Sequence, residues 1–179
     1  MSAGATAAAR ARSIVTFSLA QVGVAAVLVA VGAVQLLHGV ERDLIGMTIG
    51  IAAGLLLFYA LAHDGASKPV VAKFSAVLRL AALLIAVSIA EEIVWRGYAL
   101  ATLRATTGPI VALLATTIGF SAAHATTQGW SGIRHHLVTG FVIGLAFVLT
   151  GSLLAAVTTH LSYNLMFLRT IAPQGRLFQ

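Results

Sequence analysis

The chain of 179 residues contains no cysteine, and only 9% of its residues are charged. Without cysteine it can form no disulfide bond, thiolate zinc site or iron–sulfur cluster, and it has no cysteine nucleophile. A soluble globular domain carries about 25% charged residues, so this chain lacks the charge to cover a water-facing surface. With 59% hydrophobic residues, the composition excludes a soluble enzyme and an intrinsically disordered protein alike.

Acidic residues are also scarce, since five stand against eleven lysines and arginines and leave a formal net charge of +6. In a soluble protein this excess would suggest nucleic-acid binding. Here the basic residues stand singly between apolar runs, a pattern typical of charges that face anionic lipid headgroups and set membrane topology. We therefore expect the lipid bilayer as the partner of the chain and no nucleic acid.

Long uncharged runs predict an all-α fold, a polytopic helical bundle with about six transmembrane helices; five to seven are compatible with the runs. About 20 helical residues cross a hydrocarbon core of about 30 Å. One straight helix over residues 135–168 would be about 51 Å long, so we expect a turn at Thr150-Gly151-Ser152. The predicted spans are 13–37, 44–62, 70–103, 110–124, 137–150 and 152–168.

Basic residues and small residues refine this topology. Both termini are expected on the cytoplasmic side of the cell membrane, because that arrangement puts most basic residues inside. The inside set is Arg10, Arg12, Lys68, Lys73, Arg134, Arg169 and Arg176, against Arg42 and Arg104 outside. Glycines recur every fourth residue, which predicts close helix packing inside the bundle rather than dimerisation. These are Gly46, Gly50, Gly54, Gly140 and Gly144.

Two acidic residues lie in an apolar run, where placing a charge inside the bilayer costs free energy. Glu91 and Glu92 are deep in the third run, and a charged side chain inside a bilayer costs about 2.5–3.5 kcal/mol on insertion scales. Glu92 and Arg96 are four residues apart on one helix face, in the order that favours an ion pair. Glu91 points about 100° away, which leaves it free to act as a general base. The alternative is that both acids pair with Arg96 and only lock the bundle.

The histidines fall into two groups. Most are expected in loops or at span ends, where their rings would lie at the membrane interface. The remaining acidic residues are expected in loops, in contact with water or lipid headgroups. This group comprises His38, His63, His135 and His136, with Glu41, Asp43 and Asp64. His124 instead closes the apolar fourth span, and His160 lies inside the sixth. His160 and Asn164 share one helix face, so the two could donate hydrogen bonds to one developing oxyanion.

Three short patterns stand in order, each on its own expected membrane helix: Glu91-Glu92-x-x-x-Arg96, Phe120-x-x-x-His124 and His160-x-x-x-Asn164. Together they resemble the signature of the CAAX protease and bacteriocin-processing (CPBP, or Abi) family, which includes the type II CAAX prenyl endopeptidases. The resemblance covers about residues 70–168, as a catalytic core of four spans. Residues 1–69 would add a hairpin of two spans and residues 169–179 a short cytoplasmic tail, within one domain.

The resemblance implies an intramembrane glutamic endopeptidase, formerly described as a metalloendopeptidase, that needs no cofactor. Glu91 and His124 would activate the attacking water, and His160 and Asn164 would form the oxyanion hole. Glu92, Arg96 and Phe120 would support the site. General-base and oxyanion chemistry agree with these roles. The substrate is expected to be a peptide or protein, with prenylated tails, bacteriocin-like leaders and membrane-protein segments all open.

Three other interpretations use the same residues. A zinc protease could take Glu91, His124 and His160 as ligands, although the chain lacks a His-Glu-x-x-His motif. A proton-coupled transporter would also place Glu and His inside the membrane, but the sequence has no internal repeat. A non-catalytic membrane protein, such as an immunity factor, would use these residues only for packing.

Overall fold

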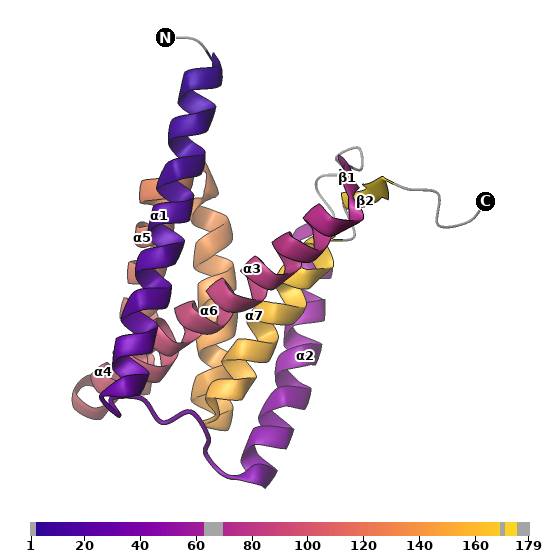
Figure 1. The fold of residues 1–179 in the computed structure, drawn as a ribbon. Coiled ribbons are helices and arrows are strands. Elements are labelled where there is room, and N and C mark those ends of the chain that lie inside the picture. The colour runs from indigo at the N-terminus through magenta and orange to yellow at the C-terminus, as the bar shows by residue number, and fades with distance from the viewer. Residues whose placement is uncertain (1–2, 63–69, 169–170, 175–179) are drawn as a thin grey trace.

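The computed structural model describes residues 3–62, 70–168 and 171–174. Figure 1 shows a bundle of helices, which confirms the expected all-α membrane fold. The long helices are α1 (Ala3–Ala30), α2 (Val40–Ala62), α3 (Phe74–Glu92), α5 (Pro109–Gln128), α6 (Ile133–Thr150) and α7 (Leu153–Phe167). Between α3 and α4 (Ala101–Thr107) lies a π-helical segment, Ile93–Leu100, and a 3₁₀ turn, Trp130–Gly132, precedes α6. Two short strands, β1 (Val70–Lys73) and β2 (Ile171–Gln174), pair in parallel.

Membrane-spanning character is clearest in four of the described helices. By length and composition the segments that could cross a bilayer are Arg12–Ala30, Val40–Leu61, Pro109–Gln128 and Ile133–Thr150. Large apolar side chains on these helices face outward, among them Leu19, Leu56, Ile110 and Leu149. An outer surface of this kind suits lipid, where all backbone polar groups are satisfied within helices. The chain is therefore a membrane protein, and the count of six crossings stays a prediction.

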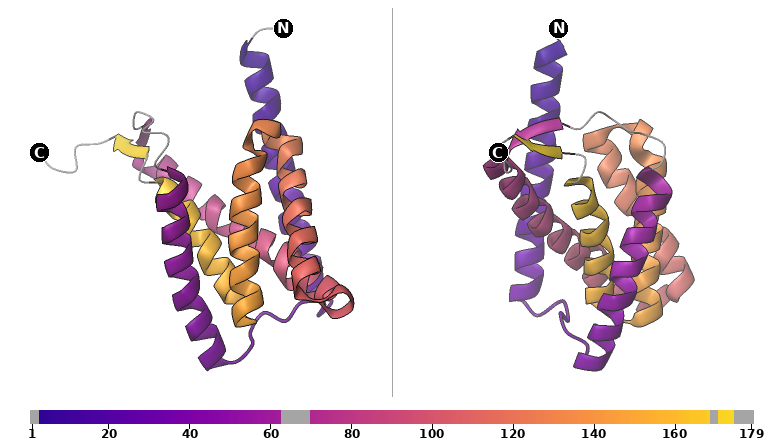
Figure 2. Two further views of the ribbon diagram at one scale, coloured as in Figure 1. Left: turned by 180° about the vertical axis from the view of Figure 1, so that it is seen from behind. Right: turned by 90° about the vertical axis from the view of Figure 1, so that its right-hand side faces the viewer.

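Helix packing brings both parts of the chain into one bundle. α2 lies beside α7 in both views of Figure 2, and α3 passes obliquely between these helices and α1. The helices alternate in direction, so both described chain ends lie toward the same end of the bundle in Figure 1. The loop predicted over residues 63–69, with its His63, Asp64 and Lys68, lies outside the described residues. Of the predicted tail, only residues 171–174 are described, as β2.

Glycines of α2 explain its close approach to α7. A Cβ at Gly46 would lie 2.8 Å from the Cβ of Ser152, and one at Gly54 would lie 2.8 Å from the Cβ of Ser162. Between them, a Cβ at Gly50 would collide with the side chain of Thr158. The expected packing role of this stripe within the bundle is confirmed, because no side chain larger than hydrogen fits at these contacts.

Several helix ends differ from those predicted. The first span was expected to reach Leu37, but α1 ends at Ala30, and Gly32 follows with φ of +69°. The fourth span was expected to end at His124, but α5 continues to Gln128, where Gly129 has φ of +86°. Positive φ is readily adopted only by glycine, so glycine position, rather than the end of the apolar run, sets both boundaries.

Asp43 is buried, which corrects its assignment to a solvated loop. The residue is 6% exposed, and its carboxylate accepts a hydrogen bond from Ser152 Oγ at 2.5 Å and another from the backbone N–H of His38 at 2.8 Å. It lies in the first turn of α2, where a negative charge interacts favourably with the helix dipole. Asp43 thereby joins the start of α2 to the turn between α6 and α7 that was predicted at Gly151.

Candidate active site

A fully buried ion pair anchors the centre of the bundle. Glu92 is 0% exposed and Arg96 is 1% exposed, and Arg96 Nη1 lies 3.1 Å from Glu92 Oε1. Arg96 Nη2 also donates to the carbonyl oxygen of Gly140 at 2.7 Å, and the guanidinium lies 4.8 Å above the ring of Phe120. The pair predicted from the sequence is present, and it ties the π-helical segment to α5 and α6. π-Helical turns are rare and are frequent at functional sites.

Glu92 has a second partner that no sequence pattern indicated. His160 Nδ1 lies 2.7 Å from the same Oε1 that accepts from Arg96. One turn earlier on α3, the fully buried Ser88 accepts a hydrogen bond from Asn164 Nδ2 at 2.9 Å. The two antiparallel helices α3 and α7 therefore meet in two polar contacts. Along each helix, the two contacts lie four residues, about one turn, apart. Ser88 was detectable only as a polar residue on the Glu92 face.

Glu91 points away from this pair and into a cavity. Its Oε1 lies 3.5 Å from His124 Nε2, and its Oε2 lies 3.9 Å from His160 Nε2. Gln21 of α1 donates to Oε1 from Nε2 at 3.2 Å. The structure thus gathers Glu91, His124 and His160 from α3, α5 and α7, an arrangement that the family resemblance implied. It also shows that α1 contributes a contact to the site rather than only a span.

The orientation of the His124 ring follows from its hydrogen bond. His124 Nδ1 lies 2.9 Å from the carbonyl oxygen of Phe120. Because a carbonyl oxygen only accepts, Nδ1 carries the proton and Nε2 is presented to Glu91. The Phe120 ring lies 4.3 Å from the His124 ring, and the His136 ring stacks on it at 4.2 Å. Phe120 therefore holds His124 through both its backbone and its ring.

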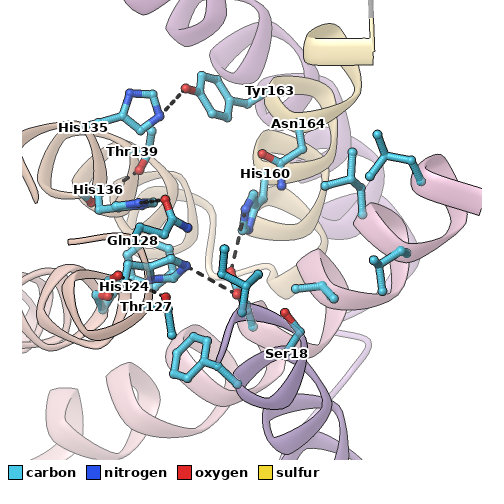
Figure 3. Close-up of a pocket in the computed structure, with 18 residues that line it drawn as sticks. Ser18, His124, Thr127, Gln128, His135, His136, Thr139, His160, Tyr163 and Asn164 are labelled. Atoms are coloured by element: carbon cyan, nitrogen blue, oxygen red, sulfur yellow. Dashed lines mark hydrogen bonds and ion pairs between the residues drawn. The ribbon is translucent and has the colours of Figure 1, made fainter. Parts of the chain in front are cut away.

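The cavity has a volume of about 370 Å³. Figure 3 shows His124, His136 and His160 facing it from three helices. One wall is apolar and comes from α1 and α3: Ile14, Phe17, Leu80, Leu83, Leu84 and Val87. The other wall is polar and comes from α5, α6 and α7: Thr127, Gln128, His135, His136, Thr139, Tyr163 and Asn164. The cavity can therefore hold an extended group that is apolar along one side and polar along the other.

His135 and His136 belong to this wall, which corrects their assignment to a headgroup interface. Both are half-buried in the first turn of α6. His135 Nε2 is hydrogen-bonded to the hydroxyl of Tyr163, and His136 Nε2 lies 2.9 Å from Gln128 Oε1. The cause of the difference is that α6 begins at Ile133, directly after the 3₁₀ turn, so the pair already lies on the helix between α5 and α7.

Comparison with protein families identifies the family of the chain. Residues 73–166, more than half of the chain, match the family described as Type II CAAX prenyl endopeptidase Rce1-like. The chain belongs to this family. Comparison with curated proteins and with solved structures finds no match. The residues matching the Rce1-like family carry all three sequence patterns, whereas α1 and α2 precede them. Membership establishes CAAX-protease-like intramembrane proteolysis in general terms.

A zinc site formed by Glu91, His124 and His160 was one of the interpretations left open by the sequence. Among the described residues, no group of three or more His, Asp and Glu side chains is arranged to hold a metal ion. Zinc ligation by Glu91, His124 and His160 stays the alternative to a metal-free site.

Arg96→Ala is expected to lower the melting temperature as well as the activity of this Rce1-like protein. The substitution leaves Glu92 with His160 alone, and breaking a buried ion pair costs about 3–5 kcal/mol. A double variant, Glu92→Gln with Arg96→Gln, should recover part of the stability because no unpaired charge remains. Thermal unfolding of both variants in nanodiscs is the measurement. An unchanged melting temperature in Arg96→Ala would show that the pair carries no stabilising role.

Proposed function

We propose that this Rce1-like protein is an intramembrane glutamic endopeptidase in which Glu91 and His124 activate a water molecule. The observation that carries the proposal is the approach of Glu91 Oε1 to His124 Nε2 at 3.5 Å, inside a cavity of the bundle. In the neutral form of the ring, with Nδ1 donating to Phe120, Nε2 is an acceptor, as is the carboxylate. The two hydrogens of one water molecule would satisfy both groups and hold its oxygen beside them.

Hydrolysis then proceeds by proton transfers at these residues. Glu91 takes one proton from the water while the water oxygen forms a bond to the carbonyl carbon of the substrate. The electron pair of the carbonyl moves to its oxygen. When the tetrahedral intermediate collapses, Glu91 returns the proton to the peptide nitrogen as the C–N bond breaks. The products are a new carboxylic acid, which keeps the second hydrogen of the water, and a new amine, and Glu91 is again ionised.

His160 and Asn164 are the proposed donors to the oxyanion, because both line the cavity beside Glu91. One N–H of the Asn164 amide is engaged by Ser88, and the second remains for the substrate. For His160 to donate from Nε2 while its Nδ1 faces Glu92, the ring carries both protons. Glu92 would then hold that ring in place, and the two carboxylates of Glu91 and Glu92 would balance the positive charges of the ring and Arg96.

The divided cavity supports a peptide or protein substrate that carries an apolar group. Its apolar wall, with Phe17 and Leu84 among its members, suits a prenylated tail, the apolar part of a bacteriocin-like leader or a membrane segment. We further propose that the chain is a multi-pass protein of the cell membrane with both termini cytoplasmic. This rests on the excess of basic residues on that side in the predicted topology.

The test is hydrolysis of a peptide library by the purified protein in nanodiscs, with prenylated and unprenylated members, before and after a strong chelator. We expect cleavage that survives the chelator, since no step requires a metal. If the chelator abolishes cleavage and zinc restores it, the metal-free mechanism is wrong. If the wild-type protein cleaves nothing while its biological effect in cells persists in Glu91→Gln, the protein is a non-catalytic membrane factor.

A further inference from the structure

An amide on α1 touches the proposed catalytic carboxylate from outside the residues that match the family. Gln21 lies in an apolar stretch of α1 and is 8% exposed. Its Nε2 donates to Glu91 Oε1 at 3.2 Å, across a separation of 70 residues. A polar side chain buried in a membrane helix is expensive and marks a functional or structural contact. The matched residues begin only at residue 73, so this contact is an addition to the core.

The surroundings of the two Glu91 oxygens show what the contact does. Oε1 receives the N–H of Gln21 and faces His124, whereas Oε2 faces His160 at 3.9 Å. The terminal torsion of a glutamate is broad and has no strong intrinsic preference. An external donor is therefore needed to keep one oxygen toward His124 and the other toward His160. Gln21 is the donor from α1 that fills this position.

The rest of α1 supports a role at the site. Ile14, Phe17 and Ser18 line the cavity, and with Gln21 they lie on one face at helical spacing. The ring of Phe17 meets the ring of His124 edge-on at 5.7 Å. α1 thus forms one wall of the cavity, and Gln21 continues that wall to the carboxylate.

We propose that Gln21 is a positioning residue that fixes the rotation of the Glu91 carboxylate for water activation; this inference rests on the proposed function. The competing explanation is that the hydrogen bond only holds α1 against α3. Gln21 Oε1 argues against that explanation, since it is buried without a hydrogen-bond partner among the described residues. An unsatisfied buried acceptor lowers stability. Replacing this amide by an apolar side chain of similar shape removes that unsatisfied acceptor together with one donor to Glu91. The two effects on stability have opposite signs, so we expect the fold to stay intact.

The experiment compares Gln21→Met with Gln35→Met. Methionine keeps the unbranched shape but has no N–H, and Gln35 is an exposed glutamine whose Nε2 donates to the backbone oxygen of Leu37. In nanodiscs, we expect kcat of Gln21→Met to fall about tenfold or more, as loss of a hydrogen bond to a charged group implies. KM should stay within about twofold, since the bond acts on Glu91 and not on the substrate. The melting temperature should not fall, and Gln35→Met should match the wild-type protein throughout.

Gln21→Asn provides the second test of the same contact. It keeps an amide but is one methylene shorter, so it should lose kcat like Gln21→Met because its N–H no longer reaches Oε1. Unchanged kcat in both variants, while wild-type cleavage depends on Glu91, overturns the positioning role and leaves the proposed function standing. A fall in melting temperature that accounts for the loss of activity assigns Gln21 to helix packing and also overturns it. If the wild-type protein does not cleave, both inferences fail together.

Discussion

Glu91→Gln should lower kcat by about 10²–10⁴-fold, the contribution typical of a general base, while the melting temperature stays near that of the wild-type protein. Glutamine keeps the shape of the side chain and can still contact Gln21, His124 and His160, which surround the carboxylate. It cannot accept the proton of the attacking water. Peptide hydrolysis and thermal unfolding, measured on the same nanodisc preparation, separate catalysis from folding.

Two further glutamates provide matched controls for this substitution. Glu41→Gln changes an exposed residue at the start of α2 and should alter neither activity nor stability. Glu92→Gln removes the buried partner of Arg96 and His160, so it should lower the melting temperature together with the activity. If Glu91→Gln instead fails to accumulate in the membrane while Glu41→Gln accumulates normally, Glu91 is structural and its assignment as the base is wrong.

The predictable part of this protein rests on short-range regularities of helices. The scarcity of charge and the long apolar runs suffice for a helical membrane bundle, because lipid forces backbone polar groups to pair within each segment. The Glu92–Arg96 ion pair could also be predicted from the sequence, since it depends only on a separation of four residues within one helix. The separate direction of Glu91, about 100° from Glu92, also follows from helix geometry, and the structure shows Glu91 facing His124.

Contacts between helices could not be predicted from the sequence, because no local sequence pattern indicates them. Gln21 and Ser88 are uncharged polar residues in largely apolar helices, and their partners Glu91 and Asn164 lie 70 and 76 residues away. A lone amide or hydroxyl has no periodic pattern, and its direction depends on how the helices cross. Asp43 was misassigned for the same reason: its charge favoured a solvated loop, whereas Ser152, 109 residues distant, binds it in the interior.

His160 and Asn164 each bind a residue of α3, so they could either donate to the oxyanion or only hold α3 against α7. If they form one oxyanion hole, His160→Ala and Asn164→Ala should each lower kcat by about 10²–10³-fold, the usual effect of losing one donor. KM should change little, because the oxyanion exists only in the transition state. The double variant should lose clearly less than the product of the two factors, since residues that act as a unit are not additive.

Ser88→Ala is the control that separates donation to the oxyanion from helix pairing. It breaks the same hydrogen bond as Asn164→Ala but leaves both N–H groups of the amide available to the substrate. If Asn164 only pairs the helices, the two variants should lose stability and activity equally. If Asn164 donates to the oxyanion, its loss of kcat should far exceed that of Ser88→Ala at similar melting temperatures. Equal kcat in the two variants, or strict additivity of the His160 and Asn164 effects, would remove the shared oxyanion hole from the mechanism.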